Sequence, residues 1–254
     1  MKIAAVIPVR MASSRFPGKP LLNIRGLPMV EHVRRRTLLC KKFSEVVVTT
    51  CDSEIASVVR GYGGKILMTS LSHAGALDRV AEATEYLDCS HVVNVQGDEM
   101  LVLPEDLELM VMAMSTDPGT AAWNGVGRIR NMDDLKDPSI VKLIVSKSNR
   151  VLFCARDFTH VTLPGPLFEP VRLSIGVMGY GRAFLERYRN MERTPLEIAQ
   201  SIDQLRIVEY DEMMRVVEFS GWYPSINEPR EVELVERCLS EDPLQREVLR
   251  QILD

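Results

Sequence analysis

The sequence has no apolar run that approaches the roughly 20 residues needed to span a membrane. Its five cysteines are widely spaced and contain no Cys-x-x-Cys pair, which argues against a disulfide framework or a zinc site. A net charge of −4 offers no general basic surface for nucleic acid. Met1 and Lys2 lead directly into an apolar stretch, which leaves no room for a signal peptide. We therefore expect a cytoplasmic protein that binds neither membrane nor nucleic acid.

Two common phosphate-binding signatures, the Walker loop and Gly-x-Gly-x-x-Gly, are also missing. The uncharged run 3–7 is typical of a strand buried on both faces. A cluster of cations follows this run. The next segment contains Arg10, Ser14, Arg15 and Lys19 but no acidic residue. Open α/β sheets bind ligands just past the C-terminal ends of their strands, and such a cluster suits a polyphosphate. The alternative is a solvated basic turn without a ligand.

Strand and helix patterns alternate over the first hundred residues, and this alternation predicts a parallel sheet with right-handed crossovers. The predicted strands are 3–7, 45–50, 65–68 and 91–95, and the predicted helices are 29–40, 54–62, 77–87 and 104–114. Strands at 120–126, 141–145, 151–154 and 172–180 then follow without intervening helices, which predicts an antiparallel portion. The remaining predicted elements are helices 183–190, 195–206, 231–239 and 243–253 and a strand at 215–219.

We therefore expect an α/β fold with a doubly wound, mostly parallel sheet. The chain from 1 to 254 should form a single domain, with a smaller antiparallel lobe within about 120–220.

A second informative site follows the predicted strand 91–95, where the chain reads Gln96-Gly-Asp-Glu99. An acidic residue at the C-terminal end of a parallel strand points into the ligand crevice, a natural position for nucleotide-bound Mg²⁺. Gly97 permits a tight turn that would expose Asp98. Asp98 and Glu99 would otherwise cap a helix or lie in a solvated turn. The cationic loop earlier in the chain favours the metal.

From Ile7 to Leu21 the chain reads Ile-Pro-x-Arg-x-x-Ser-x-Arg-x-Pro-Gly-Lys-Pro-Leu. This motif resembles the signature loop of sugar-activating nucleotidyltransferases. It looks most like the 3-deoxy-manno-octulosonate (Kdo) cytidylyltransferase family. The resemblance extends over nearly the whole chain through the segments 25–29, 93–99, 195–197 and 204–206. It implies a nucleotide-diphospho-sugar transferase-like fold and transfer of CMP from CTP to an acidic 2-keto sugar, as in lipopolysaccharide biosynthesis. Pyrophosphate would be released, Mg²⁺ would be the cofactor, and the enzyme would be a homodimer.

The resemblance also assigns roles to individual residues. It implies the catalytic residues Arg10, Lys19 and Asp98, of which Arg10 and Lys19 hold the triphosphate and Asp98 holds the metal. It implies substrate-binding roles for Ser14, Arg15, Arg79 and Gln96. The reaction is a displacement at phosphorus, in which positioning and charge neutralisation supply most of the catalysis.

Several positions depart from the family pattern. The family's Ser-Gly-Thr reads Gly75-Ala-Leu77, which weakens the case for contacts to the nucleotide base there. A second metal carboxylate of the family aligns with Asn227, so we expect weaker Mg²⁺ binding unless Glu228 or Glu231 substitutes. Ser174 stands where the family has His, and Met178 where it has Tyr.

These departures indicate that the nucleotide apparatus is kept and that the acceptor pocket is rebuilt. The polar residues left to bind an acidic acceptor are Arg156, Arg172, Asp203 and Gln204, each of which could instead form a structural salt bridge. Two alternatives stay open: a nucleotidyltransferase for another nucleotide or acceptor, and a nucleotide-binding paralogue without catalysis. All three hypotheses require Lys19 and Asp98 to face each other across one cleft.

Overall fold

The computed structural model describes residues 1–12, 15–129, 131–158, 170–221 and 223–253. In the first half, strands and helices alternate as predicted. The strands are β1 (Ile3–Pro8), β4 (Glu45–Thr50), β5 (Lys65–Met68) and β6 (His91–Val95). The helices are α1 (Met29–Leu39), α2 (Ser53–Gly61), α3 (Ala76–Thr84) and α4 (Pro104–Thr116). A short 3₁₀ turn, η1 (Lys19–Leu21), and the hairpin β2 (Asn23–Ile24) and β3 (Leu27–Pro28) lie between β1 and α1.

The second half begins with strands and ends with helices. Its strands are β7 (Ala122–Arg128), β8 (Lys142–Val145), β9 (Val151–Ala155), β10 (Val171–Gly181) and β11 (Met214–Glu218). Its helices are α5 (Met132–Lys136), α6 (Arg182–Tyr188), α7 (Pro195–Gln200), α8 (Asp203–Glu209), α9 (Glu231–Glu241) and α10 (Pro243–Leu253).

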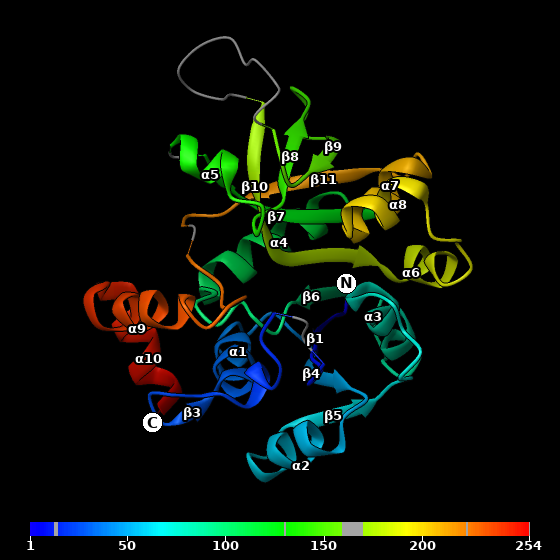
Figure 1. Cartoon of the computed structure of the whole chain (residues 1–254). Helices are drawn as coiled ribbons and strands as arrows, with labels where there is room; N and C mark the ends of the chain where they lie inside the picture. Colours follow the sequence, from blue (N-terminus) through cyan, green and yellow to red (C-terminus); the bar gives the residue numbers. More distant parts are fainter. Residues whose placement is uncertain (13–14, 130, 159–169, 222, 254) are drawn as a thin grey trace.

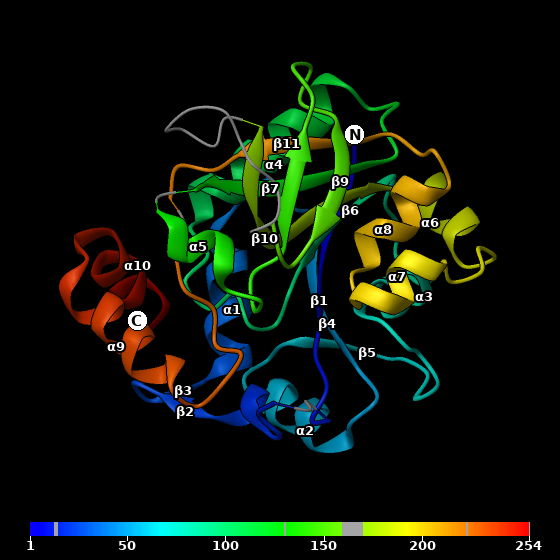
Figure 2. The same ribbon diagram turned by 45° about the horizontal axis from the view of Figure 1, so that its top comes forward.

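Within the described residues, nine strands form one mixed sheet with the main order β11-β7-β10-β6-β1-β4-β5. β1 pairs in parallel with β4 and β6, and β4 pairs in parallel with β5. β10 runs antiparallel to both β6 and β7. The predicted α/β class with a mostly parallel sheet is confirmed, and the sheet is flanked by helices on two sides (Figures 1 and 2).

The predicted antiparallel portion is present and continues the central sheet. The start of β10 pairs with β8 through Val171–Leu173, and β8 pairs with β9. The later part of β10 pairs with β6 through Val177–Gly181. One long strand therefore links the parallel strands to the antiparallel ones, and β8 and β9 extend beyond the main sheet in Figure 1.

Alternate residues of β1 enter two separate apolar cores. Ala5 and Ile7 pack into one core with α1 and α4, while Ala4 and Val6 pack into the other with α3. Successive side chains of a strand point to opposite faces, so an uncharged run is what a strand covered on both sides requires. The short uncharged run after Lys2 thus explains why β1 lies centrally in the sheet.

The predicted helix 195–206 is wrong: the structure has two helices, α7 and α8. Ser201 interrupts them with a left-handed backbone (φ 53°), and the buried Ile202 follows. The break turns the chain so that Asp203 and Gln204 begin a new helix. Helix α5 was not predicted; Asn131 begins it by accepting hydrogen bonds from two backbone N–H groups.

Across the described ranges, no helix is both long enough and apolar enough to cross a membrane. The longest described helix, α4, has 13 residues and begins with Pro104 and two acidic residues.

Candidate active site

The cationic loop after β1 is held by backbone hydrogen bonds. The Gly18 N–H donates to the Met11 carbonyl (3.0 Å), and the Met11 N–H donates to the Asp52 carboxylate (2.8 Å). Gly18 has φ 77°, a left-handed conformation that glycine adopts without strain. Lys19 follows immediately and begins η1. The loop therefore presents Lys19 from a position fixed by its neighbours.

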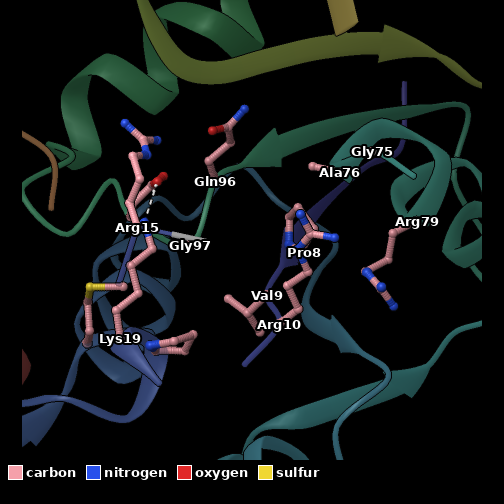
Figure 3. Close-up of a pocket in the computed structure, with 13 residues that line it drawn as sticks. Pro8, Val9, Arg10, Arg15, Lys19, Gly75, Ala76, Arg79, Gln96 and Gly97 are labelled. Atoms are coloured by element: carbon pink, nitrogen blue, oxygen red, sulfur yellow. Dashed lines mark hydrogen bonds and ion pairs between the residues drawn. The ribbon is translucent and has the colours of Figure 1, made fainter. Parts of the chain in front are cut away.

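A cavity of about 240 Å³ lies at the C-terminal ends of β1 and β6. Among the described residues, four cations line it: Arg10, Arg15, Lys19 and Arg79. Figure 3 shows Arg15 and Lys19 on one side, Arg79 on the other and Arg10 between them. Gln96, Gly97 and Asp98 also line the cavity. Most of the predicted nucleotide-site residues thus surround one space.

Lys19 and Asp98 are in direct contact. Lys19 Nζ donates to Asp98 Oδ2 (2.9 Å) and to the Ile226 carbonyl (2.8 Å). The tight turn before Asp98 requires glycine, because a Cβ at Gly97 would lie 2.2 Å from Val9 Cγ1. The predicted juxtaposition of the cationic loop and this carboxylate is confirmed.

Asn227 lies next to this ion pair and contacts a second cation. Its Oδ1 accepts a hydrogen bond from Arg15 Nη2 (2.9 Å). The Glu231 carboxylate, which could have replaced the missing metal ligand, accepts the backbone N–H groups of Asn227 and Glu228. Glu228 pairs instead with Arg230 (2.9 Å). The acids near Asn227 therefore face other partners.

The oxygen atoms near Lys19 fit Mg²⁺ bound together with a nucleotide. Mg²⁺ prefers oxygen ligands and commonly takes one or two carboxylates plus substrate phosphates. Asp98 supplies a carboxylate and Asn227 an amide oxygen, and each already accepts a hydrogen bond from a cation. In the described part of the chain, no group of three or more His, Cys, Asp or Glu side chains could hold a metal ion. The protein ligands alone are thus too few for a tight metal site.

Glu99 follows Asp98 but is not among the residues that line this cavity. Its Oε1 accepts the Gly176 N–H (2.8 Å), which ties the end of β6 to β10. Its removal from water and the neighbouring Asp98 charge raise the pKa of Glu99 to about 8. A Cβ at Gly176 would lie 2.7 Å from this oxygen, so the glycine makes the contact possible. Glu99 therefore connects two strands beneath the site.

Arg79 lines the cavity from α3 and is almost fully buried. Its guanidinium donates to Thr69 Oγ1 and contacts Cys51 Sγ (3.5 Å). These partners follow β5 and β4, so Arg79 holds the ends of two strands together. A positive charge with only neutral partners among these contacts can still attract a phosphate.

A larger cavity of about 530 Å³ adjoins the first and shares Arg10, Arg15, Gln96 and Asp98 with it. Arg156, Asp203, Gln204 and Asn227 also line the larger cavity. The structure thus brings the predicted acceptor residues Arg156, Asp203 and Gln204 to the side of the nucleotide site that lies toward β10 and α8.

Four backbone carbonyls hold the Arg156 guanidinium in place. Its guanidinium donates to the carbonyls of Pro138 (3.0 Å), Ser139 (3.3 Å), Gln200 (3.2 Å) and Ser201 (3.3 Å). Burial and the nearby Arg15 charge lower the pKa of Arg156. Because carbonyls are neutral, Arg156 keeps an uncompensated positive charge among these contacts, on a wall that also carries Asp98, Glu99 and Asp203.

Two predicted residues are not part of this arrangement. Arg172 lines neither cavity and forms an ion pair with Glu218 (3.1 Å), so the structure favours the salt-bridge alternative for it. Ser14 lies outside the described residues.

Sequence reasoning missed two polar residues at or behind the larger cavity. Asn94 lines the cavity, and Asn124 bonds to Gln204 and Ser174 of its wall. Both are buried within otherwise apolar strands, and this mismatch of a polar residue with its strand was the available signal. Gly75 and Asp203 form a close pair: a Cβ at Gly75 would lie 3.0 Å from both Asp203 carboxylate oxygens. The altered loop at Gly75 thus makes room for an acid from α8.

Cations and a carboxylate gathered at the C-terminal edge of a mostly parallel sheet define this chain as a nucleotidyltransferase.

Known proteins specify the family. The family model described as Cytidylyltransferase matches residues 4–214. A 3-deoxy-manno-octulosonate cytidylyltransferase of Geobacter metallireducens is 36% identical over 250 residues, covering 94% of this chain and 98% of that protein. An 8-amino-3,8-dideoxy-manno-octulosonate cytidylyltransferase of Shewanella halifaxensis is 32% identical over 249 residues, covering 95% and 100%.

A solved structure gives the same result. The structure of CMP:2-keto-3-deoxy-manno-octonic acid synthetase complexed with CTP matches with a TM-score of 0.87 and 31% identity, covering 95% of this chain and 100% of that chain. The chain belongs to the 3-deoxy-manno-octulosonate cytidylyltransferase family.

Proposed function

We propose that this enzyme transfers CMP from CTP to Kdo or a related acidic 2-keto sugar and releases pyrophosphate. The observation that carries the proposal is the Lys19–Asp98 ion pair (2.9 Å) within a cavity lined by Arg10, Arg15 and Arg79. The family relatives named above support both the nucleotide and the acceptor class.

In this reaction the anomeric hydroxyl oxygen of the acceptor attacks the α-phosphorus of CTP. A new C–O–P linkage forms, the bond between the α-phosphorus and the β-phosphate oxygen breaks, and pyrophosphate leaves as the hydroxyl loses its proton. Arg10, Lys19 and Arg15 stand where they can neutralise the charge that grows on the leaving phosphates. Arg79 and Gln96 line the same space and would contact the nucleotide.

Asp98 and Asn227 would hold Mg²⁺ in this proposal. When bound, the metal polarises phosphoryl oxygens and orients the leaving group. In the free enzyme Lys19 and Arg15 contact these ligands, and we propose that each cation exchanges its protein oxygen for a phosphate oxygen on binding. Metal and nucleotide should therefore bind together.

The acceptor would occupy the larger cavity, where Arg156 and Gln204 lie. We further propose a cytoplasmic enzyme that forms a homodimer. Residues 1–254 would form a single nucleotidyltransferase domain. Its smaller lobe, within about 120–220, would cover the cleft from the side of β8 and β9.

The test is pyrophosphate release with each of four nucleoside triphosphates, Mg²⁺, and Kdo or 8-amino-Kdo as acceptor. The proposal expects turnover with CTP and at least one acid. Turnover with a different triphosphate would select the second hypothesis. CTP binding without turnover on any acid would select the non-catalytic paralogue.

A further inference from the structure

Lys19 has a second protein contact besides Asp98. Its Nζ donates a part-buried hydrogen bond to the backbone carbonyl of Ile226 (2.8 Å). A carbonyl carries no net charge, so it neutralises the ammonium far less than the Asp98 carboxylate does. The Ile226 carbonyl therefore holds Lys19 in position and leaves its positive charge available to a phosphate.

The peptide group that contacts Lys19 meets a carboxylate at its other end. The carbonyl of Ile226 and the N–H of Asn227 belong to one trans peptide, so they point in opposite directions. The Asn227 N–H donates to Glu231 Oε2. The Glu231 carboxylate and the Lys19 ammonium thus lie at the two ends of one peptide dipole. Hydrogen bonds in such a chain polarise and strengthen one another.

The helix that Glu231 begins holds this carboxylate in place. Val235 and Leu239 of α9 pack into the same apolar core as the fully buried Ile226. Glu231 Oε2 also accepts the Glu228 N–H (2.8 Å), so one oxygen fixes two successive backbone groups. The apolar core and the carboxylate together set the orientation of the peptide that faces Lys19.

Any effect of Glu231 on the reaction must be indirect. Glu231 is not among the described residues that line either cavity. Its connection to the site is the peptide whose carbonyl contacts Lys19. An ammonium has three N–H donors, so Lys19 can keep this carbonyl while another donor passes from Asp98 to a phosphate oxygen.

We propose that Glu231 is a positioning residue, which holds the Ile226 carbonyl toward Lys19 and so keeps the ammonium at the smaller cavity after it leaves Asp98. This inference rests on the proposed function and adds to it a residue that touches neither substrate.

The test compares Glu231→Ala with Glu231→Gln, which keeps an oxygen that can accept both N–H groups. Glu231→Ala should lower kcat/KM for CTP about tenfold, as expected for a lost hydrogen bond to a charged group, and Glu231→Gln should recover most of this loss. The KM for the acid should stay within about twofold in both variants. The control is Glu233→Ala, in the same first turn of α9 but exposed and paired with Arg237 (3.3 Å), which should leave kcat/KM unchanged.

Combination with Lys19→Ala separates positioning from a purely structural role. A residue that acts through Lys19 has nothing left to position once the ammonium is gone. Adding Glu231→Ala to Lys19→Ala should therefore lower kcat/KM by less than a further twofold, which single-turnover assays with labelled CTP resolve. A further tenfold loss in the Lys19→Ala background, or wild-type activity of Glu231→Ala, would overturn the inference.

Thermal unfolding shows whether each variant is folded at the assay temperature. If Glu231→Ala is not, Glu231→Asp replaces it, because this change keeps the charge and withdraws the carboxylate by one CH₂ group. A loss of about threefold is expected for Glu231→Asp, and wild-type kcat/KM would overturn the inference. Failure of the proposed function looks different, because the wild type itself would then transfer no CMP to any acid, and the inference would fall with it.

Discussion

The two adjoining cavities differ in how the chain builds them. The smaller one takes Arg10, Arg15 and Lys19 from a single loop, and its cations meet Asp98 at the end of one neighbouring strand. The larger one draws on β6, β10 and α8, and its Gln204 bonds to Ser174 of the same wall. The charged cavity is suited to a ligand shared by many enzymes, the triphosphate. The larger one is where selectivity among acids would arise.

This difference predicts that substitutions in the smaller cavity abolish catalysis, while substitutions in the larger one change which acceptor is used. The cations act on charge that develops during the reaction, and such groups change kcat strongly. Hydrogen bonds to acceptor hydroxyls act on binding and selectivity.

The largest effect is expected for Lys19→Ala. Loss of the ammonium that contacts Asp98 should lower kcat/KM about 10³-fold, because it removes a charge aimed at the leaving phosphates. The melting temperature should fall modestly, because the lost contacts with Asp98 and the Ile226 carbonyl are part-buried. Pyrophosphate release and thermal unfolding measure the two quantities. Lys147→Ala, at an exposed lysine in a distant turn, is the control. Normal turnover by Lys19→Ala would contradict a phosphate-binding role for Lys19.

Metal binding should depend strongly on the nucleotide. Lys19 neutralises Asp98 in the free enzyme, so Mn²⁺, used as a spectroscopic substitute for Mg²⁺, should bind at least about tenfold more tightly when CTP is present. Electron paramagnetic resonance titrations with and without CTP measure this. Equal Mn²⁺ affinity in both titrations would contradict the exchange of Lys19 between carboxylate and phosphate.

Asn227→Asp should have a smaller effect on the same site. A carboxylate at this position adds charge for the metal, although Arg15 competes for it at the present 2.9 Å contact. The Mg²⁺ concentration for half-maximal activity should fall several-fold at saturating CTP. An unchanged Mg²⁺ dependence would show that position 227 does not face the metal.

Gly75→Ala tests the contact between Gly75, which lines both cavities, and Asp203, which lines the larger one. The added Cβ would lie 3.0 Å from both carboxylate oxygens of Asp203, so we expect a loss of about 1 kcal/mol, which lowers the melting temperature by about 2–4 °C. Adding Asp203→Ala should reduce the cost of the Gly75 change, because the steric conflict is gone. Gly119→Ala, where nothing lies within 4 Å of the new Cβ, is the control. Strict additivity of the two changes would disprove the coupling.

The smallest effect is expected for Arg172→Ala. Arg172 pairs with Glu218 outside both cavities, and such pairs contribute about 0–1 kcal/mol. The KM for the acid should stay within about twofold of the wild type. A large rise in the KM for the acid would show that Arg172 takes part in acceptor binding.

Much of this arrangement can be predicted from the sequence where the relevant residues are contiguous. The uncharged run at β1 and the cations up to Lys19 are local patterns, and Asp98 follows directly from a strand and a glycine turn. The break at Ser201 could not be predicted, because neither glycine nor proline marks it. The position of Asn94 beside Met178 depends on the register of β6 with β10, which no local pattern encodes.

The same limit explains Arg156 and Arg172. Both are arginines near predicted antiparallel strands, and the sequence treats them alike. Only the folded chain shows that carbonyls around Arg156 hold it in the larger cavity, whereas Glu218 holds Arg172 away. Contacts between distant segments thus decide which of the predicted residues reach the larger cavity, and the sequence alone does not encode these contacts.

A structure of the enzyme with CTP and Mg²⁺ tests the central claim most directly. The account predicts that Lys19 Nζ leaves Asp98 for an oxygen of the triphosphate, with the metal on Asp98 and the nucleotide in the smaller cavity. A nucleotide bound elsewhere, or a Lys19–Asp98 contact that persists beside a bound CTP–Mg²⁺, would contradict it.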